Sequence, residues 1–159
     1  MATLSDLTGI DFFAGIPGAS LEKLAALGTV QEFAKGDVVY NYDEPTTFFC
    51  VVLKGRIMFE RNIAPGIIAT IMTLNPGDLL GVSALIESQR HKGTAVCRDQ
   101  SVILLLPGAD VIRLMNEDPA LGFMLMKKLY ATLINRLHVR TEQFLKLLAL
   151  NPELKEVMD

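Results

Sequence analysis

The residues of this chain best suited to hold a ligand lie between positions 76 and 96, in the segment PGDLLGVSALIESQRHKGTAV. Gly81 leads into a helical turn of small residues, and a polar loop with Arg90 and Lys92 follows it. Backbone N–H groups at such a turn and cations beside it are the groups that bind phosphate in proteins. The segment therefore predicts an anion site, although an ordinary solvated loop would carry the same charges.

Other reactive residues are few and isolated. His91 and His138 stand far apart, with no third histidine or spaced carboxylate, so no metal site is expected. Glu87 has no partner acid nearby, and no nucleophile is spaced with a base, so the chain is not expected to be an enzyme. Cys50 and Cys97 lie in apolar strand-like runs, and we expect two buried thiols rather than a disulfide.

Residues 29–106 have the pattern of a β-domain that could position the anion site. Short β-rich runs such as VVYNY, TTFFCVVL, RIMFERNI and IIATIMTL alternate with Gly, Pro and Asp turns. Strands spaced about 8–12 residues apart by such turns are typical of an antiparallel sandwich or barrel. No strand–helix–strand alternation is present, so a parallel sheet is not expected.

Helical patterns flank the β-domain, in residues 1–28 and 107–150. Asp118 and Pro119 form a strong helix start, and the helix that follows can run to about Leu150. Its apolar residues recur at steps of three and four, which predicts a coiled coil with a second copy of the chain through residues 119–150. Arg140 interrupts this apolar stripe, whose members are Tyr130, Leu133, Leu137, Phe144 and Leu147.

Composition narrows the class of protein. The length of 159 residues indicates one domain, 1–159, that ends in a polar tail at 151–159. The net charge is −3 without a basic block, so direct nucleic-acid binding is not expected. No run of about 18 uncharged apolar residues suggests a membrane span. The first ten residues do not resemble a signal peptide, so we expect a cytoplasmic protein.

The order of these elements resembles the cyclic-nucleotide-binding domain of the catabolite-activator and oxygen-sensor regulator family. The resemblance covers nearly the whole chain and is carried by IDFFAGIPG (10–18), FAKGDVV (33–39), FCVVLKGRI (49–57), PGDLLG (76–81) and RLHVRTE (136–142). It implies a mainly β fold: a double-stranded β-helix, or jelly-roll, barrel of about eight strands with N-terminal helices and a long C-terminal dimerisation helix. In the family's DNA-binding members a helix-turn-helix domain follows that helix, and residues 151–159 are too few to form one.

The resemblance also identifies residues 76–96 as the family's phosphate-binding cassette. Gly81 matches the family glycine, Gly93 and Thr94 match its small and hydroxyl positions, and Ser83 lies in the intervening helical turn. The family glutamate that binds the ribose hydroxyl is replaced by Val82, which has no acceptor.

The phosphate-binding arginine of the family falls on Lys92, and Arg90 lies two residues away as an alternative. A lysine balances phosphate charge but cannot form the two-pronged contact of a guanidinium. On the long helix, Arg140 and Thr141 match the family's hydroxyl pair that reads the purine.

The resemblance implies a ligand-sensing regulatory module in signal transduction. Such a module binds a cyclic nucleotide such as cAMP, or a related phosphate-bearing molecule, and relays binding through the long helix. No cofactor beyond this ligand is implied, and a protein partner is left open. Because Val82 replaces the carboxylate, a second hypothesis remains: a ligand-free dimerisation or docking module of the same fold.

Overall fold

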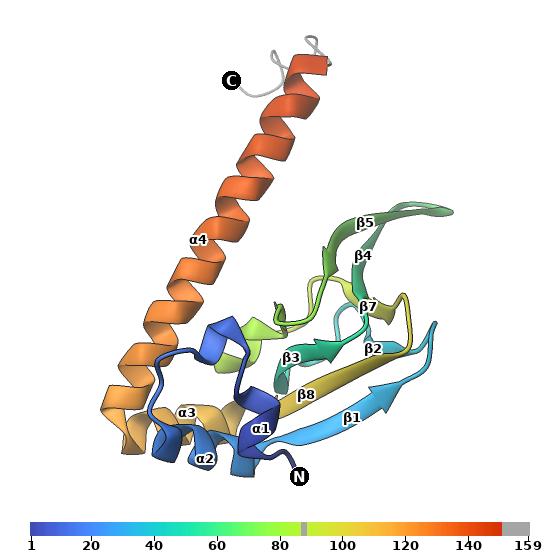
Figure 1. Cartoon of the computed structure of the whole chain (residues 1–159). Coiled ribbons are helices and arrows are strands. Elements are labelled where there is room, and N and C mark those ends of the chain that lie inside the picture. Colours follow the sequence, from blue (N-terminus) through green and yellow to red (C-terminus); the bar gives the residue numbers. More distant parts are fainter. Residues whose placement is uncertain (87–88, 151–159) are drawn as a thin grey trace. The chain divides into compact units, whose positions relative to one another are not determined.

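The computed structural model describes residues 1–86 and 89–150, in two compact units, Met1–Gly122 and the part from Phe123 onward (Figure 1). The expected polar tail, 151–159, lies outside the described residues, as does Glu87. The helices and 3-10 turns are α1 (Leu4–Leu7), η1 (Asp11–Phe13), α2 (Gly18–Leu27), η2 (Val82–Leu85), α3 (Gly108–Glu117) and α4 (Pro119–Leu150).

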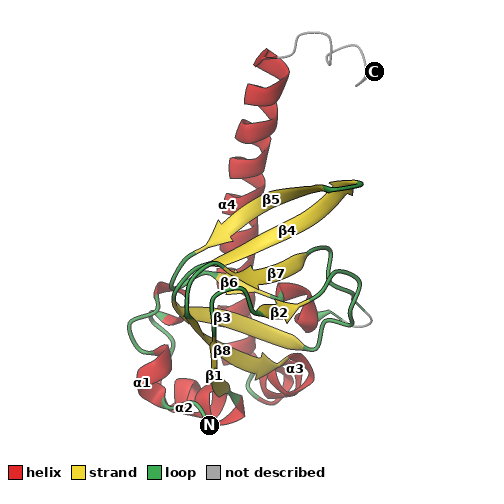
Figure 2. Cartoon of the chain, turned by 90° about the vertical axis from the view of Figure 1, so that its right-hand side faces the viewer, coloured by secondary structure: helices red, strands yellow, loops and turns green. Residues whose placement is uncertain are grey.

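The described part of the first unit has eight strands in two four-stranded antiparallel sheets, ordered β1-β8-β3-β6 and β2-β7-β4-β5 (Figure 2). The arrangement confirms the predicted mainly β fold with about eight strands, flanking helices and a long C-terminal helix. The strands are β1 (Thr29–Phe33), β2 (Val38–Tyr40), β3 (Phe48–Lys54), β4 (Ile57–Ala64), β5 (Ile67–Leu74), β6 (Leu79–Leu80), β7 (Thr94–Cys97) and β8 (Ser101–Pro107).

One hydrophobic core lies between the two sheets. Cys50 and Ile103 from the first sheet share it with Ile57 and Cys97 from the second. The apolar run of β3 supplies much of it, because Phe49 to Val52 are each no more than 1% exposed. Both cysteines are buried and free, which confirms the expectation of two buried thiols.

Close backbone contacts hold η2, the helical turn of the cassette. An added Cβ at Gly108, the first residue of α3, would lie 2.3 Å from the Ala84 carbonyl oxygen. Only a residue without a side chain lets α3 begin so near η2. The Ala84 amide in turn donates to the Gly81 carbonyl at 2.9 Å. The cassette is therefore packed directly against α3.

Residues 89–91, at the far end of the cassette, are tied to the loop between β2 and β3. The Thr46 amide donates to the Gln89 carbonyl at 3.0 Å, and the His91 amide donates to the Glu44 carbonyl at 2.9 Å. The His91 ring also stacks on Tyr40, with 3.5 Å between centroids and 6° between planes. His91 is 7% exposed, and this burial lowers its pKa, although the nearby Glu44 charge acts in the opposite direction.

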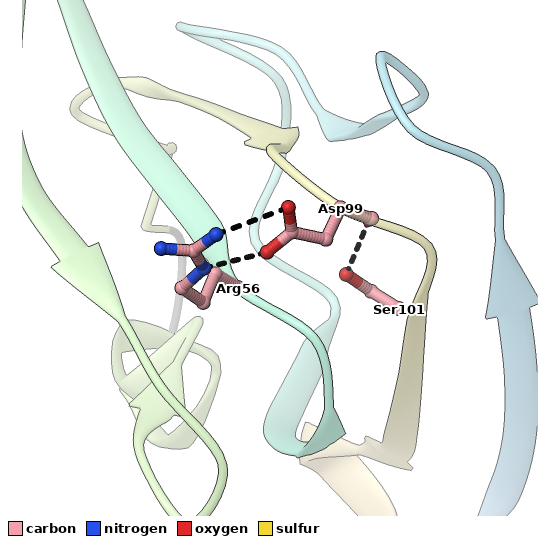
Figure 3. A network of polar contacts seen from close by, with 3 residues as sticks. All are labelled: Arg56, Asp99 and Ser101. Atoms are coloured by element: carbon pink, nitrogen blue, oxygen red, sulfur yellow. Dashed lines mark hydrogen bonds and ion pairs between the residues drawn. The ribbon is translucent and has the colours of Figure 1, made fainter.

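The turn from β7 to β8 is hydrogen-bonded to the turn from β3 to β4 (Figure 3). The Arg56 guanidinium donates twice to the Asp99 carboxylate, at 2.5 Å and 3.2 Å. This pairing lowers the pKa of Asp99. The Ser101 hydroxyl donates to the Asp99 carbonyl at 2.8 Å. Gly55, with φ +82°, brings its backbone so close that an added Cβ would lie 2.3 Å from the Ser101 hydroxyl oxygen.

Helix α4 starts where the sequence predicts. The Asp118 carboxylate accepts the Leu121 amide at 3.1 Å, an N-terminal cap that lowers the pKa of Asp118. The helix continues for 32 residues to Leu150. Among residues 1–86 and 89–150, no helix is both long enough and apolar enough to span a membrane.

Replacing Gly55 by alanine should destabilise the protein more than replacing Gly66. Both glycines have positive φ, +82° and +75°, but nothing lies within 4 Å of a Cβ at Gly66. Gly66→Ala should lower the free energy of unfolding by about 1–2 kcal/mol, which is the cost of a left-handed backbone at a residue with a side chain. Gly55→Ala should lower the free energy of unfolding by a further ~1–3 kcal/mol, because the β7–β8 turn must move to make room for the added methyl group. Urea unfolding measures both free energies, and equal losses would show that the close approach at Gly55 has no energetic effect.

Replacing His91 by phenylalanine should flatten the pH dependence of stability in mild acid. Because burial lowers the pKa of His91, the unfolded chain binds a proton first as the pH falls below about 6.5, and wild-type stability decreases there. Phenylalanine keeps a ring against Tyr40 but cannot titrate. Urea unfolding at about pH 7 and pH 5, on either side of the ordinary histidine pKa, measures the difference. His138→Gln, at an exposed site on α4, is the control and should behave as wild type. An unchanged pH dependence in His91→Phe would contradict the expectation.

Candidate functional site

Gly81 forms the turn between β6 and η2. Its backbone is left-handed, with φ 64° and ψ 25°, and an added Cβ would lie 2.2 Å from the Phe48 carbonyl oxygen. Both features require glycine at this position. The next two residues, Val82 and Ser83, are half-buried, and the Ser83 hydroxyl donates to Thr46 Oγ1 at 3.4 Å. Serine is thus engaged with the β2–β3 loop, and valine offers a ligand no polar atom.

Arg90 already has a carboxylate partner. Its Nε donates to Asp43 Oδ1 at 3.0 Å, and its backbone bridges to Pro45. Both side chains of this ion pair are at least half exposed, so the pair adds little stability. A ligand phosphate would have to compete with Asp43 for the guanidinium.

Lys92 is exposed, and its backbone is in contact with the side chain of a second cationic residue, Arg61 of β4. The Arg61 Nη1 donates to the Lys92 carbonyl at 3.1 Å, and its guanidinium lies 4.6 Å from the centre of the Tyr42 ring. Sequence analysis missed Arg61, because only the pairing of β4 with β7 brings it to the cassette. In that register Glu60 lies opposite Thr94, so Arg61 extends just beyond the end of β7.

Gly93 and Thr94 join the cassette to the sheet. Thr94 Oγ1 accepts the Tyr42 amide at 3.1 Å. Gly93 is buried, and an added Cβ would lie 2.5 Å from Phe59 Cζ and 2.7 Å from the Glu60 carbonyl oxygen. An aromatic ring of the barrel wall therefore occupies the space next to Gly93.

The burial pattern along this segment alternates. His91, Gly93, Ala95 and Cys97 are buried, whereas Lys92 between the first two is exposed. Just before Gly93, the side chain that faces inward is therefore that of His91. The two predicted cations, Arg90 and Lys92, are exposed. Sequence analysis considered His91 only as a metal ligand. Among the described residues, no group of three or more His, Cys, Asp and Glu side chains could hold a metal ion.

Arg140 and Thr141 belong to the second unit, whereas the other predicted site residues belong to the first. The Arg140 Nη1 donates to Gln143 Oε1 at 2.8 Å. The Thr141 hydroxyl donates to the Leu137 carbonyl one turn earlier, at 3.0 Å. Within α4 the two side chains are therefore bonded to groups of their own helix.

Solved structures share this fold. A cyclic nucleotide-binding protein of Geobacter metallireducens, itself assigned only provisionally, is 23% identical, with a TM-score of 0.76, and the match covers 87% of this chain and 100% of that chain. The catabolite activator protein of Thermus thermophilus is 21% identical, with a TM-score of 0.71, over 87% of this chain and 62% of that chain. The regulatory domain of Toxoplasma gondii PKA, crystallised with cAMP, is 20% identical, with a TM-score of 0.67, over 80% of this chain and 48% of that chain.

The comparison with curated proteins gives no match. The family model described as cyclic nucleotide-binding domain matches residues 30–118, which include β2 to β8, all but the first residue of β1, and the cassette. The match covers more than half of the 159 residues and confirms the resemblance seen in the sequence. The chain belongs to the cyclic nucleotide-binding domain family.

Proposed function

We propose that this chain is a ligand-sensing regulatory module whose cassette binds a small anion, a cyclic nucleotide or a related phosphate-bearing molecule. The observation that carries the proposal is the hydrogen bond from the Arg61 guanidinium to the Lys92 carbonyl, which brings a second cationic residue to the end of the cassette. The family of the chain and the cAMP complex of the Toxoplasma gondii relative support this ligand class. The ligand phosphate lies near the Lys92 ammonium and the Arg61 guanidinium.

Ligand binding acts on the helices through η2. The close contact between Ala84 and Gly108 supports this step, because a shift of η2 cannot leave the start of α3 in place. Helix α3 ends at Glu117, and α4 begins two residues later at Pro119. A packed contact that cannot deform continuously passes a small displacement on to the next element. The module thereby couples its ligand to whatever α4 contacts.

The proposed partner of α4 is a second copy of the chain. Within α4, exposed apolar side chains recur at alternating steps of three and four residues, the 3.5-residue repeat of a coiled-coil seam. We define the seam by its members, which are between 44% and 71% exposed: Phe123, Met126, Tyr130, Leu133, Leu137, Phe144 and Leu147. Arg140 occupies the one position of this repeat without an apolar residue. A dimer removes the seam from water.

A ligand-free dimerisation or docking module is the second candidate function. Val82 offers no acceptor for a ribose hydroxyl, Arg90 is paired with Asp43, and the Phe59 ring lies against Gly93. Each of these features removes one contact that a cyclic nucleotide would use. This candidate predicts the same dimer and no binding of any nucleotide.

Cyclic AMP, cyclic GMP and cyclic dinucleotides should be titrated into the full chain by calorimetry. Under the first proposal at least one of them binds, and Lys92→Met and Arg61→Met each weaken it about tenfold or more, because a charge-assisted hydrogen bond contributes about 1.5–3 kcal/mol. Lys54→Met, at an exposed position on β3, is the matched control and keeps wild-type affinity. No heat at millimolar ligand would favour the ligand-free module. Val82→Glu, which adds the missing acceptor, should then be tested for gain of nucleotide binding.

Leu137→Asp should convert a dimer to a monomer, because it places a charge in the middle of the seam. Light scattering coupled to size exclusion should give about twice the 17.5 kDa chain mass for the wild type and the single mass for the variant. Val139→Asp is the matched control: Val139 is 47% exposed, lies off the seam, and its replacement should leave the dimer intact. A wild-type monomer would refute the proposed partner.

A further inference from the structure

A cavity of about 180 Å³ in the first unit lies next to the cassette, and none of the predicted anion-binding residues lines it. Glu44, Pro45, Thr47 and Phe48 of its lining are exposed, so the cavity opens to solvent. Its walls come from β2, β3, the loop between them and the segment before β7. The lining residues that matter to its chemistry are Tyr40, Glu44, Thr47, Phe48, Cys50 and His91.

The size of the cavity matches a single ring system and not a nucleotide. An apolar cavity of about 150 Å³ in a protein core is large enough to bind benzene. Pockets for drug-sized or nucleotide-sized ligands are larger, about 300–1,000 Å³. Tyr40 and His91, whose rings stack on each other, both line the cavity and give it aromatic surface that a planar molecule can contact.

The charges at the cavity disfavour an anion. Its lining contains a carboxylate, Glu44, but neither an arginine nor a lysine. Burial lowers the pKa of His91, which keeps that ring uncharged at neutral pH. Burial also raises the pKa of the Cys50 thiol to about 12, so it lines the cavity as a neutral group. A bound anion would face Glu44 without any counter-charge from the lining.

Glu44 retains capacity to accept a hydrogen bond from a ligand. Its two oxygens accept the Asn41 amide at 2.8 Å and the Asn41 Nδ2 at 2.9 Å. A carboxylate has about four lone-pair sites, so further acceptor sites remain. Asn41 also holds the carboxylate in place, which lowers the pKa of Glu44 and keeps the group ionised.

We propose that this cavity is a second binding site, for an uncharged planar ring compound that stacks within it and donates an N–H hydrogen bond to Glu44. The site is distinct from the anion site at Arg61 and Lys92. The two are neighbours along the chain, because the backbone that closes the cavity at His91 continues into Lys92. An occupant in contact with Tyr40, Glu44 and His91 therefore stiffens the end of the cassette.

Indole is a suitable probe, because it is uncharged, planar and carries one N–H donor. In a ¹H–¹⁵N NMR titration of the full chain, indole should shift the amide resonances of Tyr40, Glu44 and His91 in a saturable manner. N-methylindole, which lacks the donor, should bind about tenfold more weakly. Indole-2-carboxylate should not bind at this site. These two comparisons separate the proposed site from non-specific apolar binding and from the anion site.

Cys50→Met should fill the cavity and abolish the indole shifts. Cys97→Met is the matched control: Cys97 is a buried thiol of the same core but does not line the cavity, so binding should persist. A cooperative thermal unfolding transition should be checked for both variants, to show that they fold. Glu44→Gln, whose side chain has nearly the same volume, should lower indole affinity about tenfold. The proposal is overturned by an absence of saturable shifts at millimolar indole, by shifts that survive Cys50→Met, or by equal binding of the carboxylate.

Discussion

Strand β7 is hydrogen-bonded on both edges, to β2 and to β4, and this double pairing determines what the cassette can present to a ligand. A strand held on both sides cannot rotate, and its residues must alternate between core and surface. The alternation already begins before the strand, at His91 and Gly93 inside and Lys92 outside. A shift of one residue would exchange these roles and bury the lysine charge.

This constraint separates the charges of the cassette from its interior. The cations lie on the outside, where the Arg61 guanidinium donates to the Lys92 carbonyl and Arg90 pairs with Asp43. The interior receives a ring, His91, stacked on Tyr40 above a small cavity. Charged groups remain hydrated in this arrangement, and the buried ring meets an aromatic partner instead of an unpaired charge. The anionic ligand and the uncharged ring compound that we propose therefore belong to different faces of the cassette.

Close backbone approaches connect this region to the helices. Gly81 lies against Phe48, and Gly108 lies against Ala84, each at a distance that no side chain permits. Contacts of this kind leave no free space between η2 and α3, which is the basis for the relay that we propose. The distinctive feature of α4 is its apolar seam, a regular repeat that is interrupted only at Arg140. An arginine at such a position weakens a coiled coil but can select its register, as polar seam residues do.

The sequence by itself determined the architecture, because the two periodicities and the turn residues are local signals. The runs VVYNY, TTFFCVVL, RIMFERNI and IIATIMTL overlap β2 to β5, and Asp118-Pro119 starts α4. Gly81 could also be placed, since a left-handed turn selects glycine wherever it occurs. The contacts between residues of the site could not be predicted from the sequence in the same way. The nearness of Arg61 to Lys92, the Phe59 ring against Gly93 and the stacking of His91 on Tyr40 all join residues far apart in the chain. Only the strand register brings these residues together, and register depends on how the whole core packs.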